Sequence, residues 1–318
     1  MKLKNTLKLL LANSRTVLSD LIFRLVFALV FIGIGATFVI PFFKSISHNP
    51  ASIELISSLK NLLVSFFKGG ASLAAADVRL VSAWKSFGSV LCSHISDLTW
   101  VSVGIIILAV LYAFVNGMAN YASGVAINSH MSSLTHVDYF RAILHKFGRG
   151  FLYQFITAVI DLVWTGLLAF LCGLFLHNTI THLSILALTI SLLLFVLGKA
   201  VFNAFFSNFL PSVVAGGNKI GVALKESFRL GAKRFGSLFA QYTFLAIVII
   251  YLNVSVAICT LCVGILITLP VSYIIVSCMK LVNYYADTKR KYYIDYDNII
   301  VPTELRGEDE QFINGLDL

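Results

Sequence analysis

Long apolar stretches make up most of the sequence, and short polar connections separate them. A helix needs about 20 apolar residues to cross the roughly 30 Å of bilayer hydrocarbon, and six stretches approach or exceed this length. They lie at residues 22–43, 99–119, 151–176, 183–208, 238–257 and 261–282. The last two are nearly continuous and too long for one span, so Asn253 or the stretch 258–264 is expected to form a turn. The pattern predicts an all-α integral membrane protein with six transmembrane helices.

A second pattern accompanies these spans. A basic amphipathic stretch precedes each odd-numbered span, as in LKNTLKLLLANSRTVLSDLIF, VDYFRAILHKFGRGFLYQF and GVALKESFRLGAKRFGSLFAQY. Each even-numbered span ends in a polar signature, and these signatures contain Asn116, Asn203 and Asn283 at nearly equal intervals along the chain. Regular spacing of this kind is typical of internal repeats. We infer a three-fold repeat of an interfacial helix followed by a transmembrane hairpin.

The connection between the first two spans, residues 44–98, is much longer than the others. Ile53, Ile56 and Leu59 follow one another at helical spacing there, before Gly69 and Gly70 break the pattern. The stretch ADVRLVSAWKSFGSVL repeats it. We expect two external amphipathic helices that either cap the bundle or lie on the outer leaflet. The predicted organisation is a six-span domain at 1–287, with 44–98 as an external insertion, and a polar cytoplasmic tail at 288–318.

Composition and charge agree with a membrane protein. Hydrophobic residues make up 58% of the chain and charged residues only 12%, with a net charge of +9. In a soluble protein this charge would suggest nucleic-acid binding, but here it fits the positive-inside rule. Lysines and arginines gather in the N-terminal segment, in the connections after the second and fourth spans, and in the tail, whereas the connections near 177–182 and 253–260 have none. This predicts a multi-pass protein of a bacterial cytoplasmic membrane with both termini in the cytoplasm.

This layout resembles bacterial six-span membrane families, such as the membrane domain attached to some glycerophosphodiester phosphodiesterases. The shared feature is a basic helix that leads into each hairpin, seen here as LKESFRLGAKRF. The resemblance implies a six-span membrane domain. It carries over no phosphodiesterase activity, because the sequence contains no catalytic domain of that kind.

An acid and a base interrupt the apolar stretches of the third and fourth spans. We expect the hairpin to turn near residue 180, and Asp161 precedes this turn by as many residues as Lys199 follows it. Because every residue of a helix adds the same rise along its axis, the two side chains reach the same depth. Charges inside a membrane usually pair or line a wet cavity, so we predict an ion pair between them. The pair either fixes helix packing, which we favour, or contacts a substrate or proton; Lys199 could instead snorkel to the interface.

Other polar residues near span ends have more ordinary interpretations. Arg24, one turn inside the first span, is predicted to snorkel to lipid phosphate. Asn116, Asn203 and Asn283 could contact headgroups or line a vestibule, but hydrogen bonds to neighbouring helices are the more frequent role of such amides.

No motif in the sequence predicts a cofactor, a metal or a catalytic centre. Cys259 and Cys262 form a CxxC without the polar strand-to-helix context of a redox pair. His177 and His182 flank a predicted external turn, and His48, Cys92 and His94 would share that side, but their spacing matches no zinc signature. The sequence also lacks the HExxH, GxSxG and phosphate-loop patterns.

Two function classes therefore remain, with a membrane enzyme a distant third. The first is a non-catalytic scaffold, accessory subunit or lipid-organising protein, with membrane lipids and another membrane subunit as candidate partners and no nucleic acid. The alternative is a transporter or channel-like protein for a small or lipid-like solute that uses Asp161 and Lys199. Transporters often rely on helices broken near the bilayer midplane, and only Pro270 interrupts a span here.

Overall fold

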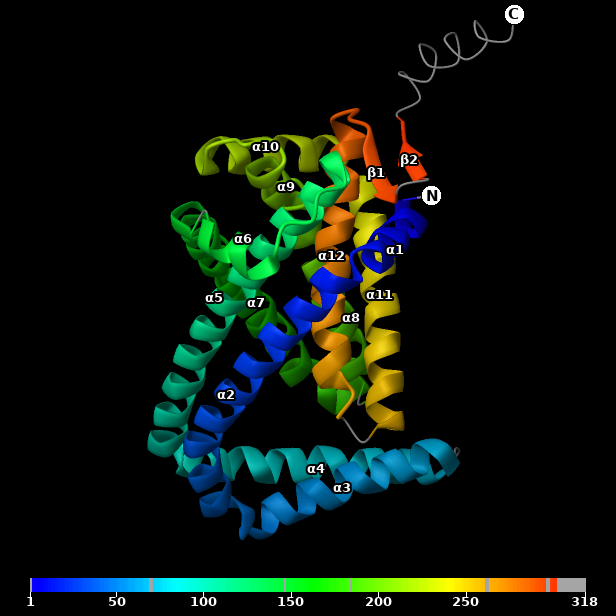
Figure 1. The fold of residues 1–318 in the computed structure, drawn as a ribbon. Coiled ribbons are helices and arrows are strands. Elements are labelled where there is room, and N and C mark those ends of the chain that lie inside the picture. The colour runs from blue at the N-terminus through cyan, green and yellow to red at the C-terminus, as the bar shows by residue number, and fades with distance from the viewer. Residues whose placement is uncertain are drawn as a thin grey trace, which may run out of the picture. The chain divides into compact units, whose positions relative to one another are not determined.

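The computed structural model, shown in Figure 1, describes residues 2–68, 71–145, 147–183, 185–260, 263–295 and 298–301. The chain folds into two compact units. The first unit combines residues 1–28, 113–161 and 199–318, and the second combines residues 29–112 and 162–198. Several long helices therefore begin in one unit and end in the other.

Six helices in the described part of the chain are long and apolar enough to cross a membrane, which confirms the six-span prediction. The chain is a multi-pass membrane protein. The helices are α2 (Ser14–Ser47), α5 (Ile95–Ser133), α7 (Phe147–Leu183), α8 (Ile185–Phe205), α11 (Phe235–Cys259) and α12 (Ile265–Asp287). Helix α9 (Phe209–Val214) follows α8 closely and extends the fourth span. Most of these helices continue past the apolar stretches that identified them, because polar residues outside the hydrocarbon can complete the helical hydrogen bonds.

A shorter helix precedes each odd-numbered span, as the amphipathic pattern predicts. These helices are α1 (Lys2–Ala12), α6 (Tyr139–His145) and α10 (Ile220–Lys233). Arg234 alone separates α10 from its span, and Asn13 alone separates α1 from its span. The three-fold repeat itself stays a prediction.

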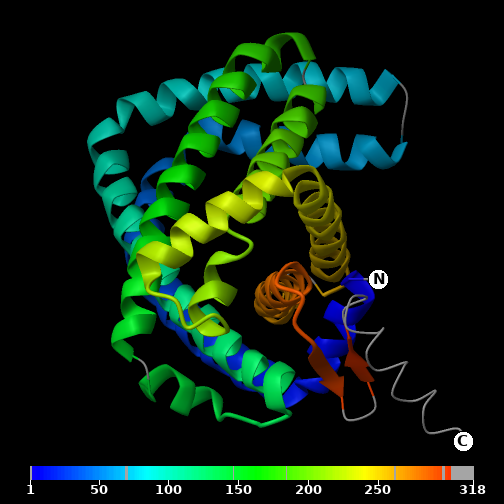
Figure 2. The same ribbon diagram turned by 90° about the horizontal axis from the view of Figure 1, so that it is seen from above.

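Helix α12 forms the centre of the first unit and packs against α1, α9 and α11. It is the most buried of the six candidate spans. Its inward positions carry several small side chains, including Ser272, Ser277 and Cys278, which let the neighbouring helices approach closely. Figure 2 shows α12 nearly end-on, with α1 and α11 beside it.

Two short strands follow α12 within the tail that composition predicted to be only polar. Strands β1 (Tyr292–Asp295) and β2 (Asn298–Ile300) pair antiparallel, and β1 contacts α1. Asn5 Nδ2 donates a hydrogen bond of 3.1 Å to Tyr292 Oη. His130 Nε2 lies 3.0 Å from the Ile294 carbonyl oxygen, which can only accept, so this ring nitrogen carries the proton. The hairpin thus joins α1 to the end of α5.

The second unit contains the two helices expected in the long connection, α3 (Pro50–Lys68) and α4 (Ala71–Ser93). They pack side by side through Leu55, Leu80 and Ala83, and both figures show the pair (Figures 1 and 2). The apolar residues that predicted α3 lie mostly on its other side and are exposed; they are Ile53, Ile56 and Leu59. Whether this face caps the bundle or meets lipid stays a prediction, and Gly69 and Gly70 lie outside the described residues.

Candidate functional site

The structure brings Asp161 of α7 and Lys199 of α8 together. Lys199 Nζ donates to Asp161 Oδ1 at 2.8 Å, and the ammonium also lies 5.7 Å from the centre of the Phe202 ring. The pair is only partly buried by the protein, since the side chains of Lys199 and Asp161 remain 29% and 39% exposed. Whether the pair only fixes helix packing or contacts a substrate or proton stays a prediction.

A third charge lies near this ion pair. Lys280 of α12 is half-buried and close enough to interact electrostatically with both Asp161 and Lys199. Lys280 lies within the predicted sixth span, and because α12 continues to Asp287 it stands about two turns before the end of the helix. The group therefore holds two cations and one carboxylate, and it carries a net positive charge.

The Asp161–Lys199 contact can be tested by a double-mutant cycle. Asp161→Asn and Lys199→Met are each expected to lower the stability of the protein in detergent by about 1 kcal/mol, a small value because both side chains are partly exposed. The double variant should recover part of the loss, since neither charge is then left alone. Unfolding by sodium dodecyl sulfate, followed by circular dichroism, measures the change. Strictly additive losses would show that the two charges do not stabilise one another.

A fully buried ion pair in the first unit joins Asp20 and Arg24, one turn apart in α2. Arg24 Nε donates to Asp20 Oδ2 at 2.6 Å, and the two side chains are 1% and 0% exposed for arginine and aspartate respectively. Two amides one turn apart in α5 accept further hydrogen bonds from the Arg24 guanidinium. Nη1 donates to Asn116 Oδ1 and Nη2 to Asn120 Oδ1, each at 2.8 Å. The Arg24 guanidinium also lies 4.9 Å from the centre of the Tyr273 ring.

The carboxylate of Asp20 is equally well satisfied. Ser123 Oγ and Tyr139 Oη donate to Asp20 Oδ1 at 2.6 and 3.0 Å. Burial, and after it the negative charge of Asp20, raise the pKa of Tyr139 above its ordinary value. The phenol therefore stays protonated and serves as a donor. These contacts join α2 to α5 and α6, so the buried charges hold the three helices together.

The structure corrects the prediction that Arg24 reaches lipid phosphate, because its side chain is buried among these partners. Asn116 bonds to a neighbouring helix in the way that such amides usually do. Asn283 is buried within hydrogen-bonding reach of Tyr242, and Asn203 is half-buried. Headgroup or vestibule contacts of Asn203 stay a prediction.

Helix α10 presents two opposite faces. Small or apolar residues occupy the buried face; they are Ile220, Ala223, Ser227 and Gly231. Ser227 Oγ donates to the Phe205 carbonyl oxygen at 2.7 Å, and a Cβ added at Gly231 would lie 3.0 Å from the Ala204 carbonyl oxygen. The buried face of α10 therefore rests directly on the backbone at the end of α8.

The exposed face of α10 carries a stripe of three cations, Lys225, Arg229 and Lys233. Their spacing of one helical turn places them along one side of the helix. Within the described part of the chain, none of them has an ion-pair or hydrogen-bond partner. The single acid of the helix, Glu226, instead accepts hydrogen bonds from Ser212 and Asn218.

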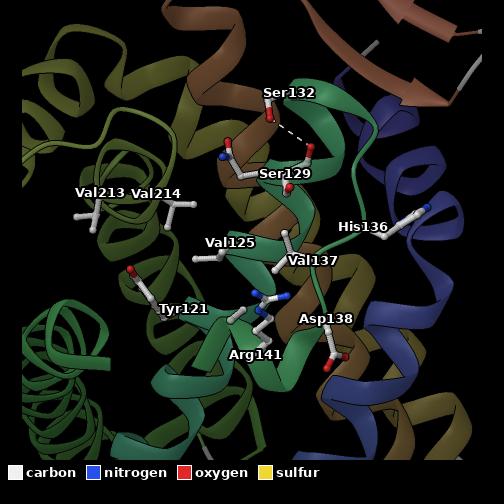
Figure 3. A pocket seen from close by; sticks show the side chains of 12 residues that line it. Tyr121, Val125, Ser129, Ser132, His136, Val137, Asp138, Arg141, Val213 and Val214 are labelled. Carbon is white, nitrogen blue, oxygen red and sulfur yellow. Dashed lines mark hydrogen bonds between the residues drawn. The ribbon is translucent and has the colours of Figure 1, made fainter. Parts of the chain in front are cut away.

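The first unit also contains a cavity of about 540 Å³ at the end of α5. Its walls come from the last turns of α5, the beginning of α6 and the end of α9 (Figure 3). Arg141, Tyr121 and Asn128 supply polar groups to it.

The remaining candidate residues form no common site. His48, Cys92, His94 and His177 belong to the second unit, and the side chain of His182 and all of Cys262 lie outside what the structure describes. Among the described residues, no three His, Cys, Asp or Glu side chains gather closely enough to hold a metal ion.

Comparison with protein-family models, curated proteins and solved structures finds no match to this chain. The resemblance in layout to six-span membrane families stays a prediction.

Proposed function

We propose that this protein is a non-catalytic membrane scaffold that organises anionic lipid at its predicted cytoplasmic face. The observation that carries the proposal is the stripe formed by Lys225, Arg229 and Lys233 on the exposed face of α10, without acidic partners among the described residues. The opposite face of the same helix is fixed to α8 through Ser227 and Gly231. The three charges are thus held outward on a rigid support.

The physical basis is the negative potential of an anionic leaflet. A lysine or arginine near such a surface contributes about 1 kcal/mol of attraction, and the effect fades within a Debye length. A basic amphipathic helix beside a transmembrane segment is the arrangement in which these charges meet headgroups. The Asp20–Arg24 network supports the scaffold role as well, because its buried charges bond to one another and to polar side chains of the same unit.

The proposal predicts selectivity for anionic lipid that depends on α10. The triple variant Lys225→Gln, Arg229→Gln, Lys233→Gln should lose the preference for spin-labelled phosphatidylglycerol over spin-labelled phosphatidylcholine. We expect the ratio of association constants to fall by about fivefold or more, which corresponds to about 1 kcal/mol. Electron paramagnetic resonance of the protein in mixed bilayers measures this ratio.

A matched control changes three exposed cations of the second unit, with Lys60→Gln, Arg79→Gln and Lys85→Gln. This variant has the same net charge as the first, and it should keep the wild-type preference. An equal loss in both variants would assign the effect to net charge and would overturn the role of α10. Raising the salt concentration should weaken the wild-type preference and leave the α10 variant nearly unchanged.

A second candidate function, movement of a lipid-like or small anionic solute, is favoured by one observation. Asp161 and Lys199 are partly exposed, and the nearby Lys280 gives their group a net positive charge. Proteoliposomes with fluorescent anionic lipid distinguish the two functions. A scaffold leaves the rate of lipid exchange between leaflets at the value of empty vesicles, whereas a transporter accelerates it and loses the acceleration in Asp161→Asn.

A further inference from the structure

The cavity at the end of α5 has the size and polarity of a ligand site. Its volume of about 540 Å³ falls within the range of small-molecule pockets, roughly 300 to 1,000 Å³. Valine side chains, including Val125, Val137 and Val213, provide apolar wall, and a few polar groups lie between them (Figure 3). This mixture is typical of sites that orient one polar group of a ligand and cover the rest with apolar surface.

Arg141 supplies a positive charge to this cavity, and no counter-ion for it lies among the residues that the structure describes. In the part of the chain that the structure describes, its guanidinium makes no hydrogen bond and no ion pair. Figure 3 shows the side chain rising from α6 toward the middle of the residues that line the cavity. A guanidinium has five N–H donors in a planar fork that matches the oxygens of a phosphate or carboxylate.

Two further donors lie in the same walls. The Tyr121 hydroxyl has no hydrogen-bond partner among the described side chains and backbone groups, although the residue is almost fully buried. Asn128 uses its Oδ1 to accept from Tyr285 Oη at 2.8 Å, and this contact orients the amide and leaves its NH₂ group as a donor. The donors of Arg141, Tyr121 and Asn128 thus reach the cavity from two helices, α5 and α6.

The cavity also contains one acid, Asp138, which immediately precedes α6. No ion pair joins its carboxylate to Arg141 within the described residues, and Figure 3 shows it directed away from the guanidinium. Asp138 therefore does not neutralise Arg141, although it lowers the net charge at the rim.

We propose that this cavity binds a phosphate-bearing anion, with Arg141 as the principal ligand and Tyr121 and Asn128 as additional donors. An anion is the class of ligand that unpaired N–H and O–H donors around an uncompensated arginine select. The site is separate from the stripe on α10, because none of the three cations there lines the cavity. The phosphate group belongs either to a lipid headgroup or to a free phosphate compound, and the chemistry of recognition is the same.

Calorimetric titration of the purified protein in neutral detergent tests this site. The probes are inorganic phosphate and dihexanoyl phosphatidic acid, with dihexanoyl phosphatidylcholine and sodium chloride at equal ionic strength for comparison. We expect saturable binding of a phosphate probe that Arg141→Gln weakens by about tenfold to a hundredfold, the effect of losing charge-assisted hydrogen bonds. Tyr121→Phe should weaken it less, because the ring remains and one neutral donor is lost.

Arg79→Gln serves as the control, because it removes an exposed arginine from α4 and should leave binding unchanged. Binding of both phosphate probes would support a site for the phosphate group itself, and binding of phosphatidic acid alone would support a lipid headgroup as the source. Arg141→Lys, which keeps the charge and loses the planar fork, should bind with intermediate affinity and shows whether loss in Arg141→Gln reflects a folding defect. The absence of saturable binding to either phosphate probe, or equal binding by the wild type and Arg141→Gln, would overturn the proposal.

Discussion

Replacement of Arg24 by methionine is expected to lower the free energy of unfolding in detergent micelles by about 3 to 5 kcal/mol. The reason is the state of Asp20, which would remain buried with no cation beside it. Ser123 and Tyr139 would still donate to the carboxylate, but neither carries a compensating charge. Titration with sodium dodecyl sulfate, followed by circular dichroism, measures the loss.

Two further variants show whether the loss of stability in Arg24→Met comes from the unpaired charge of Asp20. Arg15→Met removes an exposed arginine from the same helix and should change stability very little. The double variant Asp20→Asn, Arg24→Met should be more stable than Arg24→Met alone, because asparagine keeps an acceptor for Ser123 and Tyr139 without a buried charge. A loss in Arg24→Met no larger than that in Arg15→Met would show that the network contributes little to stability.

Gly231→Leu is expected to be the next most destabilising change, by about 3 kcal/mol. A Cβ at residue 231 would lie 3.0 Å from the Ala204 carbonyl oxygen and 3.0 Å from the Phe205 Cα, both backbone atoms that cannot move alone. A leucine there must push α10 away from the end of α8. The same unfolding titration measures the effect, and the selectivity for anionic lipid should fall with it.

The matched control is Gly221→Leu, near the beginning of the same helix. A Cβ at Gly221 meets nothing within 4 Å, and leucine has a higher helix propensity than glycine by up to about 1 kcal/mol. This variant should therefore be as stable as the wild type or slightly more so. If both leucine variants lose the same stability, the close packing of α10 on α8 is not the cause.

The sequence predicts best those features that depend only on position along the chain. Span number follows from apolar length, and the meeting of Asp161 and Lys199 follows from equal depth along two helices. The direction in which a side chain points around its helix requires knowledge of every neighbour. Arg24 illustrates this, since its partners Asn116 and Asn120 come from a helix far away in the sequence.

Some features that the sequence analysis did not predict nevertheless have a signal in the local sequence. Asp20 and Arg24 are one turn apart, and so are Asn116 and Asn120, which is the spacing of side chains that share a helix face. Apolar length alone does not point to Asp20, because it precedes the predicted beginning of the first span. The strand β1 has a signal as well, in the alternation of Tyr292 and Ile294 toward the protein, but the surrounding charged residues give the tail a uniformly polar composition. Nothing local shows that α12 is the central helix.

The position of α1 sets a time order on biosynthesis. Leu9 of α1 is completely buried, and the surfaces that cover α1 belong to α12 and β1. Asn5 and its hydrogen-bond partner Tyr292 are 287 residues apart, a distance that ribosomes cover in roughly 15 to 60 s at ordinary elongation rates. During that interval α1 lacks its partners in α12 and β1. The first unit can close only after α12 and β1 have been made, so a nascent chain stalled before residue 265 should expose α1 to proteases.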